Sequence, residues 1–85
     1  MAYYQILYWQ DIPSQVKAWD DIDEAKIELS QEFMIKIDSA AKDRDLTKED
    51  DYLNQWKWGE ELELEGSPEE VVEAIKKELE AKFKG

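Results

Sequence analysis

Acidic residues between positions 43 and 51 have the alternate spacing of a calcium-binding loop. The oxygen-bearing residues at every second position are Asp43, Asp45, Thr47, Glu49 and Asp51. The pattern lacks the residues that a calcium-binding loop requires at its sixth and twelfth positions. Lys48 stands at the sixth position in place of Gly, and Asn54 at the twelfth in place of a bidentate Glu. The sequence therefore predicts no calcium site in this segment.

A second acidic group lies at Asp20, Asp21, Asp23 and Glu24. Hard cations take carboxylate oxygens as ligands, so this segment could hold a hydrated divalent ion weakly. A solvated acidic loop explains the same residues with no ion, and it is the preferred interpretation. We expect no bound metal and no cofactor.

Nucleophilic and acid–base catalysis lack their usual residues, because the chain contains no His and no Cys. A serine needs a base to activate it, and no imidazole is present to do so. Three glycines form no phosphate loop. A glycosidase-like carboxylate pair needs a deep cleft, for which an 85-residue chain has little volume beside its core. The sequence therefore predicts a non-enzymatic protein.

The formal net charge of −11 argues against nucleic acid and against anionic membranes as partners. The acidity has two interpretations, which are solubility and electrostatic steering toward a basic protein. No run of residues approaches a membrane span and no leader pattern follows Met1, so we expect a soluble, cytoplasmic protein. The absence of Cys is compatible with that compartment.

The periodicity of apolar residues predicts a single α+β domain over 1–85. The expected elements are strands at 3–9 and 16–19, a possible short strand at 26–29, a helix from Ser30 to about 43–45, a short helix near 48–55, a strand at 58–65 and a helix at 68–83. Apolar residues on both faces of 3–9 indicate a central strand. The predicted fold is a small two-layer sandwich, in which two main helices cover an antiparallel sheet of three to four strands.

Two local signals mark the C-terminal half. Residues 58–65 alternate so that Trp58, Leu62 and Leu64 should all face inward. Ser67, Pro68 and Glu70 then form the start signal of a capping box. Weaker start signals are Ser30 and the pair Thr47 and Asp50. The apolar stripe expected on the final helix comprises Val71, Val72, Ile75, Leu79 and Phe83. Lys82 and Lys84 lie at the C-terminal end of this helix.

Four Trp and four Tyr residues are the most informative feature for function. We expect Tyr4, Ile6, Trp58 and Leu62 in the core. For Trp9, Trp19 and Trp56 the sequence is compatible with burial in the core and with exposure at the surface. The predicted partner-binding residues are Trp9, Asp11, Pro13, Trp19 and Trp56. Exposed Trp and Tyr are favoured anchors of protein interfaces, so the sequence favours an adaptor or accessory subunit that binds another protein.

Three alternatives stay open beside the adaptor, and one of them is a weak enzyme that uses Glu or Asp with a divalent metal. Indoles could instead line a shallow pocket of a module that binds a small molecule or metabolite. Homodimerisation through an exposed strand edge or aromatic face is also open, although the negative charge opposes it.

Several blocks of this sequence are similar to a small bacterial family called virulence factor. The blocks are YQILYW at 4–9, DIP at 11–13, QVKA at 15–18, LT at 46–47, YL at 52–53, WKWG at 56–59 and GSPEEV at 66–71. The family occurs as short stand-alone proteins and as a domain of longer proteins related to conserved virulence factor C. The resemblance implies an accessory role beside iron–sulfur machinery or one-carbon, corrinoid-type methyl transfer, and it implies no catalytic residues. Residues 20–35 are richer in Glu and Lys than the family pattern.

Overall fold

The computed structural model describes residues 1–46 and 48–83, the last of these by its backbone alone. The elements are β1 (Ala2–Trp9), β2 (Ile12–Trp19), β3 (Glu24–Glu28), α1 (Gln31–Asp43), α2 (Glu49–Leu53), β4 (Trp56–Trp58), β5 (Leu62–Leu64) and α3 (Pro68–Phe83). The strands form one antiparallel sheet. The predicted α+β fold is confirmed, with five strands in place of three to four.

Strand β1 lies at the centre of the sheet, as its two apolar faces predict. The order is β3-β2-β1-β4, and β5 also pairs with β1. Strand β2 begins at Ile12, four positions earlier than expected, so Pro13 lies within a strand. The register shifts there, from Leu7 opposite Gln15 to Tyr8 opposite Pro13. Such a bulge is where a strand tolerates a residue that has no N–H to donate.

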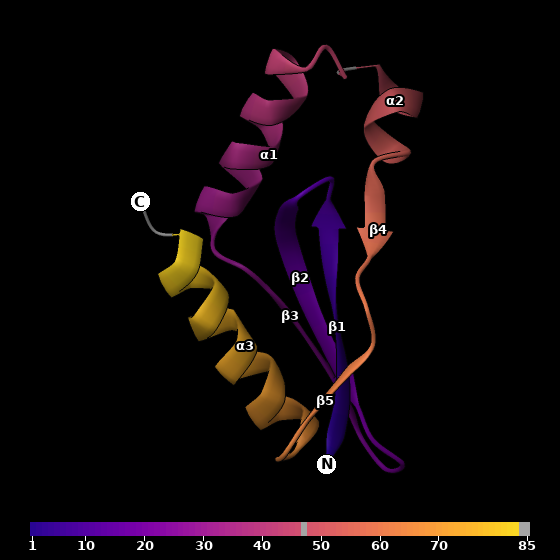
Figure 1. Ribbon diagram of the computed structural model, residues 1–85, viewed down its shortest axis with the longest axis vertical. Helices are drawn as coiled ribbons and strands as arrows, with labels where there is room; N and C mark the ends of the chain where they lie inside the picture. The colour runs from indigo at the N-terminus through magenta and orange to yellow at the C-terminus, as the bar shows by residue number, and fades with distance from the viewer. Residues whose placement is uncertain (47, 84–85) are drawn as a thin grey trace.

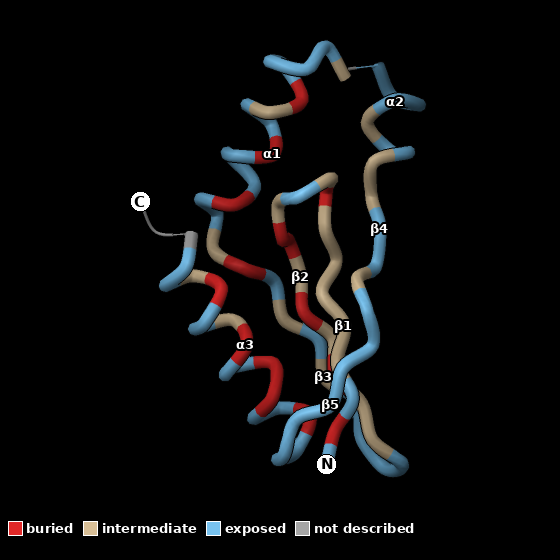
Figure 2. Tube along the Cα trace, viewed as in Figure 1, coloured by how far each residue is buried: buried red, intermediate tan, exposed pale blue. Residues whose placement is uncertain are grey.

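Helices α1 and α3 lie on the same side of the picture, with α2 and β4 across from them (Figure 1). Helix α3 packs mainly over β2 and β3. A cluster of buried residues joins it to the sheet, which we call the α3 cluster. Its members are Ala2, Val16, Ala18, Leu29, Phe33, Val71, Val72, Ile75 and Leu79. Burial follows β2 and one stripe of each long helix, whereas α2, β4 and β5 carry none (Figure 2).

The expected strand at 58–65 is two short strands separated by a register shift. Trp58 lies opposite Leu7, and an unbroken ladder would place Leu62 opposite Tyr3. Leu62 instead lies opposite Tyr4. One extra residue between the strands therefore moves Trp58 and Leu62 to opposite faces of the sheet, because side chains alternate with a period of two. The prediction that Trp58 and Leu62 share an inward face is wrong.

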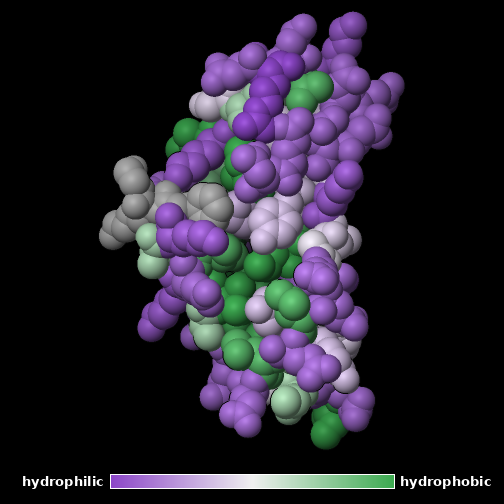
Figure 3. Space-filling model, viewed as in Figure 1, coloured by the Kyte–Doolittle hydropathy of each residue, from purple (hydrophilic) through white to green (hydrophobic). Residues whose placement is uncertain are grey.

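The leucines of β5 are also more exposed than predicted. Leu62 and Leu64 pair with Tyr4 and Ala2, which places them on the face that α3 covers. They remain 41% and 37% exposed because α3 packs mainly over β2 and β3, away from this edge. Figure 3 shows the resulting apolar surface between α3 and β5, bordered by hydrophilic side chains.

Helix α1 buries Phe33, Ile37 and Ala41, which lie on one face of the helix at helical spacing. Ser30 occupies the N-cap position, but its side chain makes no capping hydrogen bond. Its backbone N–H instead donates to Glu80 Oε1 on α3 at 3.2 Å, which ties the two helices together. Three sequence predictions, the capping role of Thr47 and the positions of the Phe83 side chain and Lys84, lie outside the described residues.

The predicted capping box at the start of α3 is confirmed. The backbone N–H of Glu70 donates to Ser67 Oγ at 3.3 Å, and the backbone N–H of Ser67 donates to Glu70 Oε1 at 3.2 Å. The Ser67 hydroxyl donates to the same carboxylate at 3.1 Å. These hydrogen bonds, the backbone one first, hold the pKa of the Glu70 carboxyl below its usual value of 4.5.

The lowered pKa of Glu70 predicts a specific loss of stability in acid. The Glu70 carboxyl group is a stronger acid in the folded state than in the unfolded chain. Its contribution to folding stability is therefore complete above pH 4.5 and is lost as pH falls through the lower folded pKa. Glu70→Gln keeps an acceptor oxygen but does not titrate. Urea unfolding between pH 6 and pH 3 should therefore show a steeper loss of stability for the wild type than for Glu70→Gln. Parallel pH profiles would contradict the assignment.

Candidate interaction surface

Four side chains form an aromatic surface on the side of the sheet that faces away from α3. They are Tyr3 of β1, Lys17 and Trp19 of β2, and Trp58 of β4; we call them the aromatic face. Ala2, Val16 and Ala18 belong to the α3 cluster. Since side chains alternate along a strand, their neighbours Tyr3, Lys17 and Trp19 point the other way.

Contacts across three strands hold the aromatic face together. Tyr3 lies opposite Trp19 in the ladder, and their rings stack with centroids 6.1 Å apart and planes at 30°. The Lys17 ammonium nitrogen lies 4.1 Å from the Trp58 ring centroid and 5.5 Å from that of Trp19. At exposed sites each cation–π contact contributes about 0.5–1 kcal/mol. The indoles are thus oriented before any partner arrives.

The aromatic face is open to solvent. Tyr3 is 39% exposed and Trp58 is 41% exposed, while Lys17 and Trp19 are half-buried. Within the described part of the chain, Lys17 forms no ion pair. Large aromatic groups that stay exposed and preorganised are the residue types that anchor protein interfaces.

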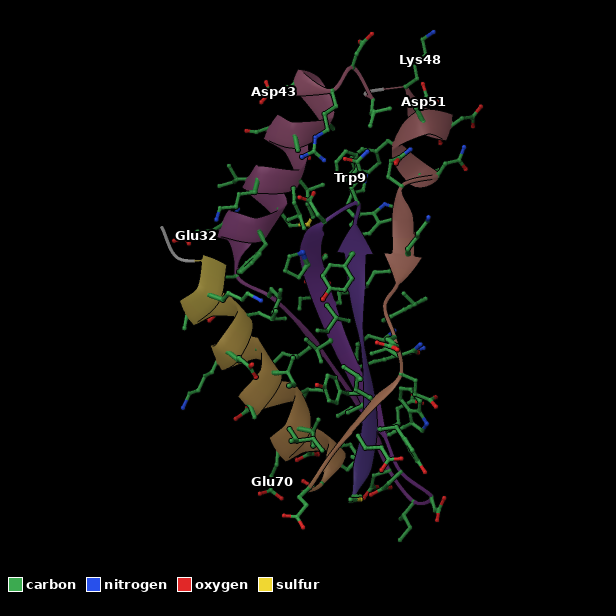
Figure 4. The ribbon with its side chains drawn as sticks, in the orientation of Figure 1. Trp9, Glu32, Asp43, Lys48, Asp51 and Glu70 are labelled. Atoms are coloured by element: carbon green, nitrogen blue, oxygen red, sulfur yellow. The ribbon has the colours of Figure 1, made fainter. Side chains whose placement is uncertain are left out.

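Trp9 lies in the interior, so the expectation that it could form an exposed patch is wrong. Its side chain is fully buried and packs against Ile37 and Ala41 of α1. The indole Nε1–H donates to the backbone oxygen of Tyr52 at 2.9 Å, and the two rings lie 5.6 Å apart. Figure 4 places Trp9 between α1 and α2 at the tip of the hairpin. The reason is tertiary: α1 and α2 cover the end of the sheet where Trp9 emerges.

The other predicted contact residues do not form one surface. Pro13 is fully buried, so its predicted contact role is wrong as well. Asp11 is exposed at the hairpin turn, 3.3 Å from the guanidinium of Arg44, which also donates to Gln10. Trp56 is half-buried and lies edge-on to Tyr52. Trp19 pairs with Tyr3 at the end of the hairpin opposite to Trp9. The distance along β1 from Tyr3 to Trp9 is roughly 20 Å at ~3.3 Å per residue.

Sequence reasoning missed Tyr3, Lys17 and Trp58 as members of this surface. A signal was present for one of the three, Lys17. In β2 the apolar residues Val16 and Ala18 alternate with Lys17 and Trp19, which is the pattern of a strand with one solvated face. The position of Trp58 depends on the register shift after it, for which the sequence offered only Gly59.

The shifted pKa values among the described residues have structural causes. Burial, assisted by the charge of Glu78, raises the pKa of Tyr4. Burial raises the pKa of Tyr52, and Asp38 adds to that effect. The backbone N–H groups of Asp23 and Ile22 lower the pKa of Asp20, which closes the turn between β2 and β3. The Asp20 carboxylate therefore has a structural role in its turn. The raised pKa values keep the Tyr4 and Tyr52 phenols protonated at neutral pH.

Two further findings concern metals and membranes. No three Asp or Glu side chains converge as a metal site in the described segments. Asp43 and Asp51 point outward from the upper end of the molecule in Figure 4. No helix within residues 1–46 and 48–83 is long and apolar enough to cross a membrane.

Comparison with known proteins identifies a family. A family model described as virulence factor matches residues 7–85. No curated protein and no solved structure matches the chain. The match contains Lys17, Trp19 and Trp58 of the aromatic face, and Tyr3 lies before it.

Proposed function

The chain belongs to the virulence factor family, and we propose that it works as a non-enzymatic adaptor or accessory subunit that binds another protein through the aromatic face. The observation that carries the proposal is the exposed, mutually oriented set of Tyr3, Lys17, Trp19 and Trp58. Trp and Tyr bring large contact area at a small entropic cost, and the sheet has already restricted their rotamers.

The negative charge of the chain also supports a protein partner. The chain carries a net charge of −11, which steers a basic partner toward it from a distance. The charge is locally positive at the centre of the aromatic face, where Lys17 lies opposite Lys26 of β3. The Lys17 ammonium lies against two indoles, whose ring faces attract its positive charge.

The proposal predicts a large effect of Trp58→Ala on partner binding and a small effect on folding. Trp58 is 41% exposed, so its removal costs little packing. As an interface anchor it should contribute at least about 2 kcal/mol, which corresponds to roughly 30-fold weaker binding. The measurement is quantitative capture on immobilised wild type and variant from a lysate of the native cell, followed by titration of the captured protein.

A matched control is Leu53→Ala, which removes a side chain 54% exposed on α2. A partner of the aromatic face should bind this variant as tightly as it binds the wild type. Equal binding of the captured protein to wild type and to Trp58→Ala would refute the proposed surface.

A further inference from the structure

A pocket adjoins the aromatic face at the end of the sheet where α1 begins. It has a volume of about 250 Å³, and its walls include Gln15 and Glu28 of the sheet, Met34 of α1 and Trp56 of β4. Gln15 lies two residues from Lys17 in β2, and Trp56 lies two residues from Trp58 in β4. Because residues two apart share a face of a strand, the pocket continues the aromatic face.

The chemistry of the walls is that of a site for a flat organic cation. Glu28 lies opposite Gln15 in the β2–β3 ladder and forms no ion pair with any described residue. Trp56 offers an indole, and Phe33 and Met34 contribute apolar surface. Ser14 is 8% exposed, and among the described residues its hydroxyl has only the weak thioether acceptor of Met34, at 3.9 Å. A carboxylate, an indole face and an underused hydroxyl together suit a planar group with several N–H donors.

The size of the pocket points to a side chain rather than to a whole cofactor. A volume of about 250 Å³ is below the usual range of small-molecule sites. An arginine side chain fits these limits. Its guanidinium can stack on an indole and donate two parallel hydrogen bonds to one carboxylate.

We propose that this pocket, which we call the Trp56 pocket, receives an arginine side chain of the partner protein, with Glu28 as the paired carboxylate and Trp56 as the stacking surface. The proposal rests on the proposed adaptor function. It specifies the partner, because the −11 charge favours a basic segment. A second copy of the chain is a poor source, since its single arginine, Arg44, is already bonded to Asp11 and Gln10.

The test uses small probes and needs no identified partner. We would titrate the full chain with N-acetyl-arginine methylamide and with its neutral isostere N-acetyl-citrulline methylamide, following the four indole N–H signals by NMR. The arginine probe should shift the Trp56 signal and bind about tenfold more tightly than the citrulline probe, as expected for one charge-assisted pair. The lysine analogue, which lacks the planar fork, should bind more weakly than arginine.

Two variants locate the effect. Glu28→Gln should reduce arginine binding to the level of citrulline, and the fold should be unaffected because Glu28 is exposed. Glu24→Gln is the matched control on the same strand and face, opposite Trp19 and outside the pocket, and it should bind arginine as the wild type does. Equal binding of arginine and citrulline, equal binding of arginine and lysine, or no shift of the Trp56 signal would each overturn the proposal.

The outcomes separate this proposal from the adaptor function. A captured partner that is lost on Trp58→Ala but retained in full by Glu28→Gln leaves the aromatic face standing and removes the arginine pocket. Conversely, an arginine-selective response of Trp56, with partner capture indifferent to Trp58→Ala, supports the pocket and removes the aromatic face as the docking surface.

Discussion

Trp9→Ala should lower the free energy of unfolding by about 3–5 kcal/mol, the cost of truncating a fully buried Trp. The indole is completely inaccessible and packs against Ile37, Ala41 and the ring of Tyr52. Its removal would leave a cavity and would also free the backbone oxygen of Tyr52 from its hydrogen bond. Since small domains have only about 5–15 kcal/mol of total stability, much of this protein's margin depends on one side chain.

Urea and thermal unfolding would measure the effect, with a fall in Tm on the order of 20 °C or more for a chain of this size. Trp58→Ala is the control, because it removes the same side chain from an exposed position. The stability of Trp9→Phe should lie between those of Trp9→Ala and Trp58→Ala, because Phe retains apolar volume but cannot donate a hydrogen bond to Tyr52. A Trp9→Ala protein as stable as Trp58→Ala would mean that Trp9 is not in the core.

Gly59→Ala should destabilise the protein by about 1–3 kcal/mol, the usual cost of adding a group to a filled site. A Cβ atom at this position would lie 2.9 Å from Tyr8 Cε2 and 3.2 Å from the backbone oxygen of Ile6. That oxygen already accepts the Gly59 N–H at 2.7 Å, so the backbone has little freedom to move away. Because Gly59 follows Trp58, the variant should also displace Trp58 from Lys17.

A double-mutant cycle tests the physical reason. Tyr8→Ala removes the ring that the new methyl group would meet, so Gly59→Ala should cost less in that background than in the wild type. Glu60→Ala, a change at the next and exposed position, should leave stability nearly unchanged. Strict additivity of the two changes would show that the strain does not come from Tyr8.

Features that depend on neighbouring residues could be predicted from the sequence. The capping box of Ser67 and Glu70 acts within one helical turn, and the stripe of Phe33, Ile37 and Ala41 follows from helical periodicity alone. The central position of β1 followed from apolar residues on both of its faces. Each of these signals lies within a short segment, so it can be recognised without knowing which distant segments pair.

The sequence predicted the type of residue on the candidate surface but not most of its positions. Aromatic residues as contact groups remain the proposal, and Trp19 belongs to both the predicted and the observed set. The burial of Trp9 could not be predicted, because it depends on α1 and α2, whose position over the hairpin tip no local pattern encodes. Tyr3 and Lys17 are brought together with Trp58 by strand pairing, although Trp58 is more than forty residues away from both in the chain.

Local hydrogen bonding and the spacing of apolar side chains were enough to predict the helices, the start of α3 and the central place of β1. They were not enough to predict where β2 begins or that residues 58–65 form two strands. The tertiary structure alone decided which indoles are buried and which are exposed. A single extra residue between β4 and β5 moves Trp58 and Leu62 to opposite faces of the sheet, and two helices close over Trp9. Register and coverage are long-range properties, since they are determined by the pairing of distant segments.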